Sequence, residues 1–273
     1  PEIEALAKYV VNTQRGTTLE KDGVKLKTTE HVLAALVGLE IDNILIEINA
    51  EEPPIMDGSS KFFVDALEKA GLKELSSLRN EYIVKDIISF NDPDSGSEIT
   101  LIPSENYQIT TMVDYETKVL GTQNATLTKL SEFKDEFSNA RTFSFLHEIE
   151  MLLENNLIKG GDLNNAIVYV DKKISENTME KLKKAFNKDK VSVKSNGILD
   201  NLNLHYQNEA ARHKLLDVLG DLALIGKRIK GKVIAKKPGH FINTQFAKKV
   251  SGIIEKEERL NMKKQEYDKK AIM

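Results

Sequence analysis

The chain has 273 residues, of which 40% are hydrophobic and 30% are charged, and its formal net charge at pH 7 is −3. This composition is ordinary for a soluble globular protein, and the length fits one large domain or two modest ones. The small negative charge argues against a nucleic-acid binder that works by phosphate neutralisation. The sequence has no apolar run long enough to span a membrane and no signal-peptide pattern, so we expect a cytoplasmic protein.

Cysteine is absent, which excludes disulfides and thiolate metal sites. Any metal ion would have to be held by histidine and carboxylate side chains, and the chain has only five histidines. A metal site in this chain would therefore draw on a small set of side chains.

The N-terminal part of the chain mixes helical and extended patterns. Apolar residues three and four positions apart predict a helix at 4–13, followed by turns between short extended runs. An apolar run behind Thr28 and Thr29, either of which can act as N-cap, predicts a second helix. A strand is expected at 41–48 and an amphipathic helix at 62–70.

A short polar link at 72–80 is the candidate domain boundary. The four segments that follow are rich in β-branched and aromatic residues and are predicted as strands: 82–90, 97–102, 107–115 and 123–130. The remaining predicted elements are helices at 147–155, 178–187, 213–221 and 246–255 and strands at 166–170 and 227–235. The charged segment at 257–273 has little core-forming content.

One helix carries a candidate pair of metal ligands. His213 and Asp217 are four residues apart in an apolar run with helical periodicity, so their side chains share one face of the helix. An imidazole and a carboxylate so placed can close on one divalent metal ion, and Asp221 continues this face one turn later. Alone, the pairing is weak evidence, because a core helix can also satisfy a His and an Asp by local hydrogen bonds.

Glu30 and His31 fall in the first turn of another predicted helix. The helix dipole favours a glutamate there, and a single histidine at such a position is usually a surface residue. With His213 and Asp217, however, His31 would complete a set of two imidazoles and one carboxylate with an open position, which a catalytic zinc ion needs. Glu30 would then point at the water molecule in that position.

A glycine turn presents His240 near the end of the chain. Its ordinary interpretation is a capped turn histidine. His147 and His205 are interpreted as ordinary surface or partly buried residues.

Six motifs occur in order along the chain. They are TTEHVLAAL at 28–36, IDN at 41–43, PIMDGS at 54–59, ARTF at 140–143, RHKLLDVLGD at 212–221 and GHFIN at 239–243. Together they resemble the UDP-3-O-acyl-N-acetylglucosamine deacetylases, the LpxC family of lipid A biosynthesis. The resemblance runs from the first residues to about residue 250.

The resemblance implies an α+β fold of two similar domains, with helices packed between two mainly antiparallel sheets. The first domain would occupy 1–78 and the second 79–256. An insert at about 143–166 would shape a passage for the acyl chain. The segment at 257–273 would be a charged tail or linker.

The resemblance also implies zinc-dependent hydrolysis of the N-acetyl group of UDP-3-O-acyl-N-acetylglucosamine, with release of acetate, during lipopolysaccharide synthesis in Gram-negative bacteria. The implied metal ligands are His31, His213 and Asp217, and iron(II) also suits two histidines and one aspartate. The other implied roles are Glu30 as general base, His240 as cationic partner of the oxyanion or leaving amine, Asp221 as the carboxylate that orients His240, Thr142 as an oxyanion ligand, and Phe143 and Lys214 as substrate contacts.

Two departures from the family pattern affect these expectations. Family members begin with a strand pair that carries a Gly-Leu-His motif, which would precede Pro1, so we expect the first sheet to lack strands and to have an exposed edge. Some members are fused to a β-hydroxyacyl-acyl carrier protein dehydratase, and the charged tail would be the start of such a linker. Otherwise we expect a monomer.

Two alternatives are a non-catalytic nucleotide-sugar or acyl-chain binding module on the same fold, and another metal amidase on this scaffold. The first would have lost a ligand or the base, but the expected side chains are all present. The second differs only in substrate, and the ARTF motif argues against it.

Overall fold

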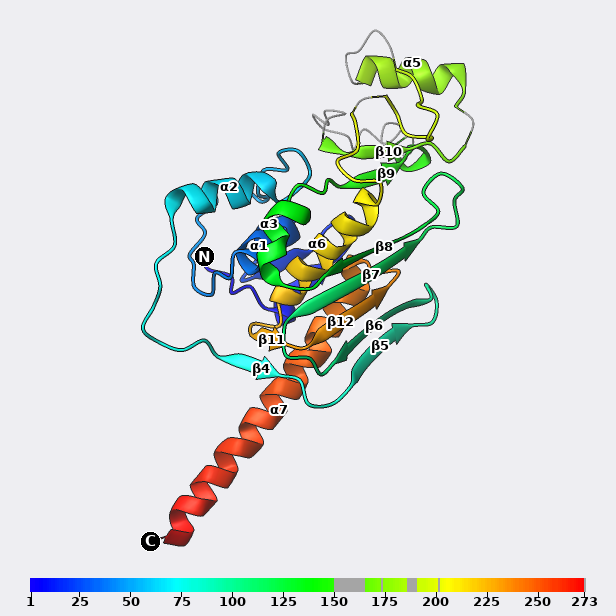
Figure 1. The fold of residues 1–273 in the computed structure, drawn as a ribbon. Helices are drawn as coiled ribbons and strands as arrows, with labels where there is room; N and C mark the ends of the chain where they lie inside the picture. Colours follow the sequence, from blue (N-terminus) through cyan, green and yellow to red (C-terminus); the bar gives the residue numbers. More distant parts are fainter. Residues whose placement is uncertain (150–164, 173, 186–190, 201, 273) are drawn as a thin grey trace.

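The computed structural model describes residues 1–149, 165–172, 174–185, 191–200 and 202–272 (Figure 1). It is a mixed helix and sheet structure with several sheets, so the predicted α+β class is confirmed.

A five-stranded sheet forms one side of the fold. Its strand order is β5-β6-β12-β7-β8, and all neighbours are antiparallel except β12 and β7, which run parallel. The strands are β5 (Ile88–Asp92), β6 (Ser97–Ile102), β7 (Gln108–Asp114), β8 (Thr122–Leu127) and β12 (Lys232–Lys236). Buried side chains alternate with more exposed ones along β6 and β7, so one face of the sheet is covered.

Three helices pack beside that covered face. α6 (Glu209–Ala223) packs on β7 and β8, α1 (Glu30–Gly38) packs on α6, and α7 (His240–Ile272) packs on α6 and β5. A Cβ atom at Gly220 would lie 2.0 Å from the carbonyl oxygen of Glu30. The close approach of α1 and α6 therefore requires glycine at this position.

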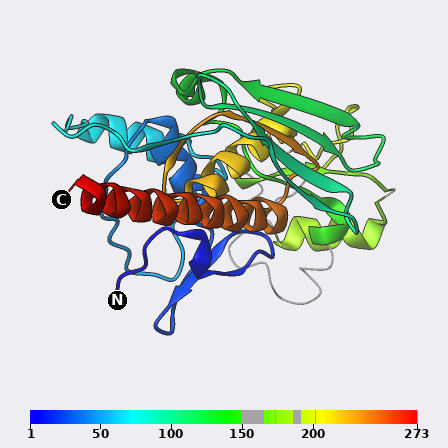
Figure 2. The ribbon, with the colours of Figure 1, turned by 90° about the horizontal axis from the view of Figure 1, so that it is seen from below.

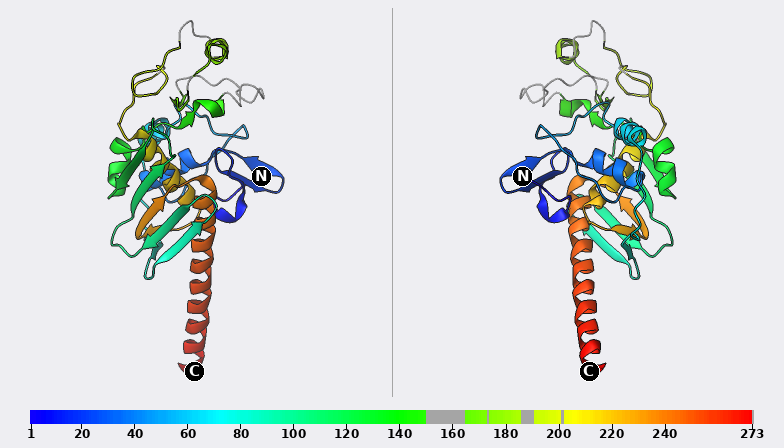
Figure 3. Two further views of the ribbon diagram at one scale, coloured as in Figure 1. Left: turned by 90° about the vertical axis from the view of Figure 1, so that its right-hand side faces the viewer. Right: turned by 90° about the vertical axis from the view of Figure 1, so that its left-hand side faces the viewer.

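The N-terminal residues form a small antiparallel sheet instead of the predicted helix at 4–13. The elements here are η1 (Ala7–Tyr9), β1 (Val10–Asn12), β2 (Thr18–Lys21) and β3 (Val24–Leu26), with sheet order β1-β2-β3. The helix prediction was wrong because the β-branched Val10 and Val11 favour a strand where a partner strand is available. Figures 2 and 3 show this sheet and the five-stranded sheet on opposite sides of α7.

The strand predicted at 41–48 is also wrong. These residues have no regular secondary structure and pair with none of the described strands. Ile44 and Leu45 are 48% and 74% exposed. An apolar pattern can indicate a strand, but a strand also needs a hydrogen-bonding neighbour, which the pattern does not reveal.

Two predicted strands are each divided in two. The segment at 82–90 contains parts of β4 (Glu81–Ile83) and β5, and the segment at 227–235 contains β11 (Arg228–Lys230) and most of β12. β11 pairs with β4 in a separate sheet. A Cβ atom at Gly231 would lie 2.7 Å from a valine side chain, so the chain passes between the two sheets at a glycine.

The last helix is longer than predicted. α7 begins at His240 and continues to Ile272 through most of the segment at 257–273. An ion pair at i,i+4 spacing, Glu255 with Arg259, supports this charged part of the helix. The described side chains of its C-terminal half are exposed, and the helix projects from the body of the molecule (Figure 1).

A small lobe lies at the end of the molecule away from the C-terminus (Figures 1 and 3). Its described elements are β9 (Phe143–Phe145), the parallel neighbour β10 (Ile167–Tyr169) and α5 (Glu176–Ala185). Its separate core consists of Leu146, Ile149, Val168, Leu182 and Leu199. Most of the predicted insert at 143–166 and of the predicted helix at 147–155 lies outside the described residues.

The remaining described elements are α2 (Lys61–Ala70), η2 (Leu130–Glu132) and α3 (Phe133–Glu136). Among the residues that the structure describes, no helix is both long enough and apolar enough to cross a membrane. The division of the chain into domains at 1–78 and 79–256 stays a prediction.

Candidate active site

Three candidate metal ligands meet where α1 packs on α6. His31 lies in the first turn of α1, and His213 and Asp217 lie on one face of α6. One ligand atom of each residue lies within 4.8 Å of the other two. Oδ1 of Asp217 is 3.4 Å from Nε2 of His213 and 3.8 Å from Nε2 of His31. The three donors therefore surround a space of the size that a single ion requires.

Hydrogen bonds hold the ring of His213 and the backbone of His31. Nδ1 of His213 lies 3.0 Å from the carbonyl oxygen of Ala140, so Nδ1–H donates to that carbonyl and Nε2 is free to bind a metal ion. The carbonyl of His31 accepts a hydrogen bond from the Ser60 hydroxyl at 2.7 Å. The two imidazole rings meet edge-on, with centroids 5.1 Å apart.

Burial and neighbouring charges set the protonation states of the three ligands. Removal from water, together with nearby His213, lowers the pKa of His31 to about 3, and burial lowers the pKa of His213. Burial alone would raise the pKa of Asp217, but His213 and Lys214 beside it hold that pKa well below its usual range. The site thus presents two neutral imidazoles and a carboxylate, the forms in which these groups bind metals.

The carboxylate of Asp217 supplies a test of whether a cation fits. Asp217 is 1% exposed, and its Oδ1 atom has no hydrogen-bond partner in the described part of the chain. A buried, unpaired carboxylate oxygen is unfavourable, and a cation held with His31 and His213 would satisfy it. The donor set therefore fits zinc or iron(II).

A second cluster lies beside the first. Nδ1 of His240, the first residue of α7, is 3.0 Å from Oδ2 of Asp221, and Nε2 of His240 is 3.8 Å from Oε1 of Glu30. Glu30 and Asp221 are almost completely buried, and the His240 side chain is 11% exposed. Three residues predicted for catalysis are thus brought together by three different helices.

Burial and charge act in opposite directions on this second cluster. Burial alone would lower the pKa of His240, but Asp221 and the other nearby carboxylates raise it to about 9. Burial raises the pKa of Glu30, the His240 cation opposes this, and the resulting pKa is about 7. At neutral pH His240 is therefore a cation that can donate a proton, and Glu30 can accept or release one.

Two further residues hold the second cluster, and the sequence analysis missed both. The Thr17 hydroxyl donates to Oδ1 of Asp221 at 2.5 Å, and the Thr17 N–H donates to Oε2 of Glu30 at 2.9 Å. The side-chain amide of Asn243 donates to Oδ2 of Asp221 at 2.8 Å. The GHFIN motif contains Asn243 three residues after His240, which is a usable signal. Thr17 gave none, because it lies 204 positions from Asp221 in the sequence.

A buried ion pair anchors the ARTF segment beside the metal ligands. Nε of Arg141 lies 2.8 Å from Oε1 of Glu209, and the two side chains are 9% and 0% exposed. The Thr142 N–H donates to the carbonyl of Gly58 at 2.8 Å. These bonds fix the backbone of Thr142 two residues after the carbonyl that orients His213. The oxyanion role of the Thr142 hydroxyl stays a prediction.

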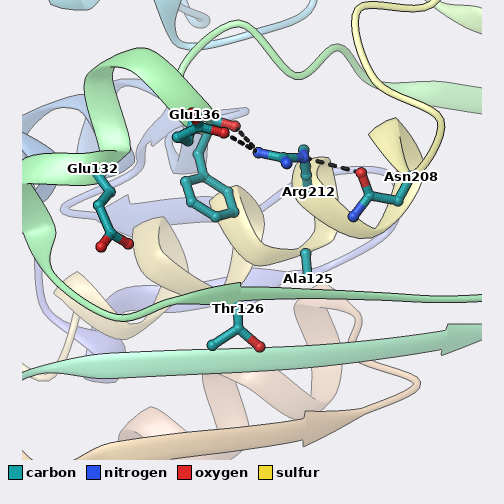
Figure 4. Close-up of a pocket in the computed structure, with 7 residues that line it drawn as sticks. Ala125, Thr126, Glu132, Glu136, Asn208 and Arg212 are labelled. Carbon is teal, nitrogen blue, oxygen red and sulfur yellow. Dashed lines mark hydrogen bonds and ion pairs between the residues drawn. The ribbon is translucent and has the colours of Figure 1, made fainter.

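Arg212 fastens the start of α6 to α3 (Figure 4). Its Nη1 atom is 3.0 Å from Oε2 of Glu136, and its Nε donates to Oδ1 of Asn208 at 3.0 Å. The guanidinium also lies 4.0 Å from the centroid of the Tyr206 ring. Arg212 therefore supports the helix turn that carries His213. The hollow of about 380 Å³ beside Arg212 is separate from both clusters.

The predicted substrate contacts Phe143 and Lys214 lie together next to the metal ligands. Nζ of Lys214 is 5.5 Å from the centroid of the Phe143 ring and donates to Oδ2 of Asp217 at 2.8 Å. Phe143 meets Tyr115 and Tyr169 edge-on, with centroid distances of 5.5 and 5.8 Å. These rings form an aromatic wall at the site, and the binding roles of Phe143 and Lys214 stay predictions.

The two histidines without a predicted role belong to neither cluster. His147 stacks on Phe145, and its Nδ1 lies 3.2 Å from Oδ1 of Asp171. The His205 N–H donates to Oε2 of Glu209 at 2.7 Å, so this residue contributes to the anchoring ion pair through its backbone.

A mixed α+β fold that encloses two histidines and a carboxylate, with a glutamate, an aspartate and a histidine alongside, defines the class of candidate metal-dependent hydrolases. The sequence profile of the UDP-3-O-acyl N-acetylglycosamine deacetylases (LpxC) matches residues 1–192 and 177–252 of this chain. The chain belongs to this family.

Individual relatives agree with the family assignment. Over 250 residues the chain is 46% identical to the bifunctional enzyme LpxC/FabZ of Bacteroides thetaiotaomicron, covering 92% of this chain and 54% of that protein. Over 249 residues it is 36% identical to the UDP-3-O-acyl-N-acetylglucosamine deacetylase of Myxococcus xanthus, covering 91% of this chain and 71% of that protein. The chain thus spans about half the length of the bifunctional relatives it matches.

Proposed function

We propose that this protein removes the N-acetyl group from UDP-3-O-acyl-N-acetylglucosamine by metal-dependent hydrolysis, releasing acetate, in lipid A biosynthesis. One observation carries the proposal: a metal-binding set and a proton-transfer set lie side by side where α1, α6 and α7 meet. Family membership supports the choice of substrate. Other metal amidases need the same two sets, so the substrate rests on the family.

His31, His213 and Asp217 would hold the metal ion, and zinc or iron(II) suits this donor set. A bound ion of this kind polarises an amide carbonyl and makes a neighbouring water molecule a better nucleophile.

Glu30 would act as the general base. Its pKa of about 7 lets it accept a proton from the attacking water at neutral pH. The Thr17 N–H donates to Oε2 and leaves Oε1 to face the reacting centre. General bases in such positions typically contribute a factor of about 10² to 10⁴ in rate.

His240 would act as the general acid. The amine that leaves must take up a proton, and the pKa of about 9 keeps the imidazole protonated at neutral pH. Asp221 accepts from Nδ1 and so directs Nε2 towards Glu30 and the reacting centre. In the preceding step, when water adds to the carbonyl, the still protonated His240 would stabilise the oxyanion, together with the Thr142 hydroxyl.

We assign substrate contacts to Phe143 and Lys214 at the aromatic wall. Phe143 offers an apolar face beside the metal ligands, and Lys214 offers a cation to the polar part of the substrate. A passage for the acyl chain along the segment at 143–166 follows from the family resemblance and falls largely outside the described residues.

A fused dehydratase unit and a cytoplasmic location complete the proposal. Three relatives named as bifunctional LpxC/FabZ enzymes are 44–46% identical to this chain, whereas five named as deacetylases alone are 36–38% identical. This difference supports a bifunctional parent protein. The mass of the native protein, measured in its source cells, tests the fusion.

The first experiment combines metal content with turnover. We expect about one zinc or iron ion per chain, loss of that ion in His213→Ala, and release of acetate from UDP-3-O-acyl-N-acetylglucosamine. Glu30→Gln should bind the metal and be inactive. A metal-loaded, folded chain that binds the substrate without releasing acetate would instead support a non-catalytic binding module.

A further inference from the structure

Thr17 contacts two functional groups at once through two different atoms. Its hydroxyl donates to Oδ1 of Asp221 at 2.5 Å, and its N–H donates to Oε2 of Glu30 at 2.9 Å. The residue is 0% exposed, so bulk water does not compete for either bond. We infer that Thr17 is a positioning residue that fixes Glu30 relative to the Asp221–His240 pair.

This inference rests on the proposed deacetylase function, in which Glu30 and His240 move successive protons at one reacting centre. Glu30, Asp221 and His240 belong to α1, α6 and α7, so packing of three helices sets their mutual distances. Thr17 belongs to none of these helices and immediately precedes β2. It therefore joins the base and the acid by a route independent of the helix contacts.

The carboxylate of Asp221 depends on three donors from two segments, the start of α7 and the N-terminal turn. His240 and Asn243 bind Oδ2, and Thr17 binds Oδ1. Without the Thr17 hydroxyl, Oδ1 of Asp221 would be a buried acceptor that has lost this donor. The loss raises the free energy of the present orientation of the carboxylate, so the carboxylate would tend to rotate. Rotation would misdirect the imidazole of His240, because Oδ2 orients its Nδ1.

The turn that carries Thr17 is itself hydrogen-bonded to the residue that precedes α1. The Thr17 carbonyl accepts from the N–H of Thr29 at 3.3 Å and from the Thr29 hydroxyl at 3.2 Å. A Cβ atom at Gly16 would lie 2.9 Å from Oε1 of Glu30, so the turn lies directly against the catalytic carboxylate. Thr17 is thus fixed to the helix that carries Glu30 and reaches across to α6.

The test removes the hydroxyl while keeping the shape. Thr17→Val in the metal-loaded protein should lower kcat by roughly 10- to 100-fold, since small misplacements of catalytic groups cost about this much. KM should stay within about twofold, and metal content should be unchanged. Thr17→Ser keeps the hydroxyl and should keep at least about a third of the wild-type kcat.

Thr111→Val is the matched control. Thr111 is also 0% exposed, and its hydroxyl donates to the carbonyl oxygen of Ala211 at 3.0 Å. Ala211 belongs to α6, the helix that carries Asp221. The kcat of Thr111→Val should stay within about twofold of wild type. If Thr17→Val does not fold, Thr17→Ser and Thr17→Ala form a second pair that differs only in the hydroxyl. Equal kcat values within the pair that folds overturn the inference.

A double-mutant cycle distinguishes positioning through Asp221 from general damage. In an Asp221→Asn background, Thr17→Val should lower kcat by less than about twofold, because the acceptor is already altered. An equal loss in both backgrounds overturns the inference. Metal content is measured in every variant, so that loss of the metal ion is not mistaken for an effect on kcat.

A second readout separates this inference from the proposed function. If wild type releases no acetate, the deacetylase proposal fails, and Thr17 is then judged by NMR alone. The Nδ1 proton of His240 should exchange with solvent more slowly in wild type and Thr17→Ser than in Thr17→Val. Equal exchange rates overturn the positioning role whatever the substrate is.

Discussion

Glu30 and His240 face each other at the meeting point of three helices, with Oε1 of Glu30 3.8 Å from Nε2 of His240. Each group favours the charged form of the other, although both are removed from water. The separation exceeds that of a direct hydrogen bond and suits a bridging water molecule or substrate atom. The two groups can therefore act on one reacting centre, and their pKa values set the pH range of activity.

We expect a bell-shaped dependence of kcat/KM on pH. Activity needs ionised Glu30, whose pKa is about 7 before metal binds, and a bound cation will move this acidic limb to lower pH. Activity also needs protonated His240, so the rate should fall as pH rises through about 9. Initial rates between pH 5 and 10 measure both limbs.

His240→Gln should lower the rate by about 10² to 10⁴ and abolish the alkaline limb. His147→Gln is the matched control, because His147 pairs with Asp171 outside both clusters, and its profile should equal that of wild type. An alkaline limb that persists in His240→Gln would assign that proton to another group.

Ionised Glu30 should destabilise the metal-free protein at alkaline pH. Its folded pKa of about 7 lies above the reference value of 4.5, so the folded chain retains a proton that the unfolded chain has released. Its contribution to stability therefore falls as pH rises from about 4.5 to 7 and stays low above that range. Glu30→Gln should make the metal-free chain more stable than wild type by roughly 1–3 kcal/mol at pH 8 and equal to it near pH 4. Urea unfolding at the two pH values measures this.

Glu209→Gln is the contrasting control for that experiment. Glu209 is equally buried but pairs with Arg141, so its loss leaves a buried cation without its partner. We expect a destabilisation of about 3–5 kcal/mol at pH 8. If Glu30→Gln behaves like Glu209→Gln, the carboxylate of Glu30 stabilises the fold, and the idea that its burial lowers the free energy of unfolding is wrong.

Gly220→Ala should separate α1 from α6. The added methyl group would lie 2.0 Å from the Glu30 carbonyl oxygen, and neither backbone can yield without moving its helix. We expect a loss of about 1–3 kcal/mol in stability and of at least tenfold in kcat, because Glu30 and the ligand His31 shift together. Thermal unfolding and turnover measure both effects.

Gly252→Ala provides the control, since Gly252 also lies within a helix but has open space, with no neighbouring atom within 4 Å, where a Cβ atom would lie. It should be neutral or slightly stabilising, because alanine favours helix more than glycine does. Comparable damage from both substitutions would refute the role of the α1–α6 contact.

Metal uptake should release few protons from the ligands. The pKa of His31 is about 3 and that of His213 is lowered, so both imidazoles are already neutral at pH 8. At that pH Glu30 is mostly ionised as well. Calorimetric titration of metal-free protein with zinc, in buffers of different ionisation enthalpy, should therefore give about one proton per ion or fewer, because a metal-bound water with a pKa near 7 can supply one and the ligands supply none. Release of clearly more than one proton per ion would show that a ligand is protonated before binding.

The sequence was most informative where one helix carries the whole signal. The spacing of His213 and Asp217 places both side chains on one face, and the predicted helix is present as α6. The apolar run behind Thr29 likewise became α1 and carries His31. The structure brings these residues together as the motifs suggest, whereas their catalytic roles remain predictions.

The sequence was least informative where structure depends on distant partners. Val10 and Val11 fit a helical pattern but lie in strand β1, and residues 41–48 fit a strand but pair with none of the described strands. Thr17 lies in the region where only turns and short extended runs were predicted, and its contacts are with Glu30 and Asp221 in other segments. Such contacts are decided by tertiary packing, which no local pattern contains.

The hydrogen bond between Thr17 and Asp221 spans 204 positions of sequence, and this separation has a consequence for how the site arises during folding. Contacts between distant segments form late, because the entropy lost in closing a long loop must first be offset by other interactions. We therefore expect the proposed base, Glu30, and the proposed acid, His240, to become aligned only late in folding, once the N-terminal turn has packed on the helical core. Hydrolytic activity would then report completed folding.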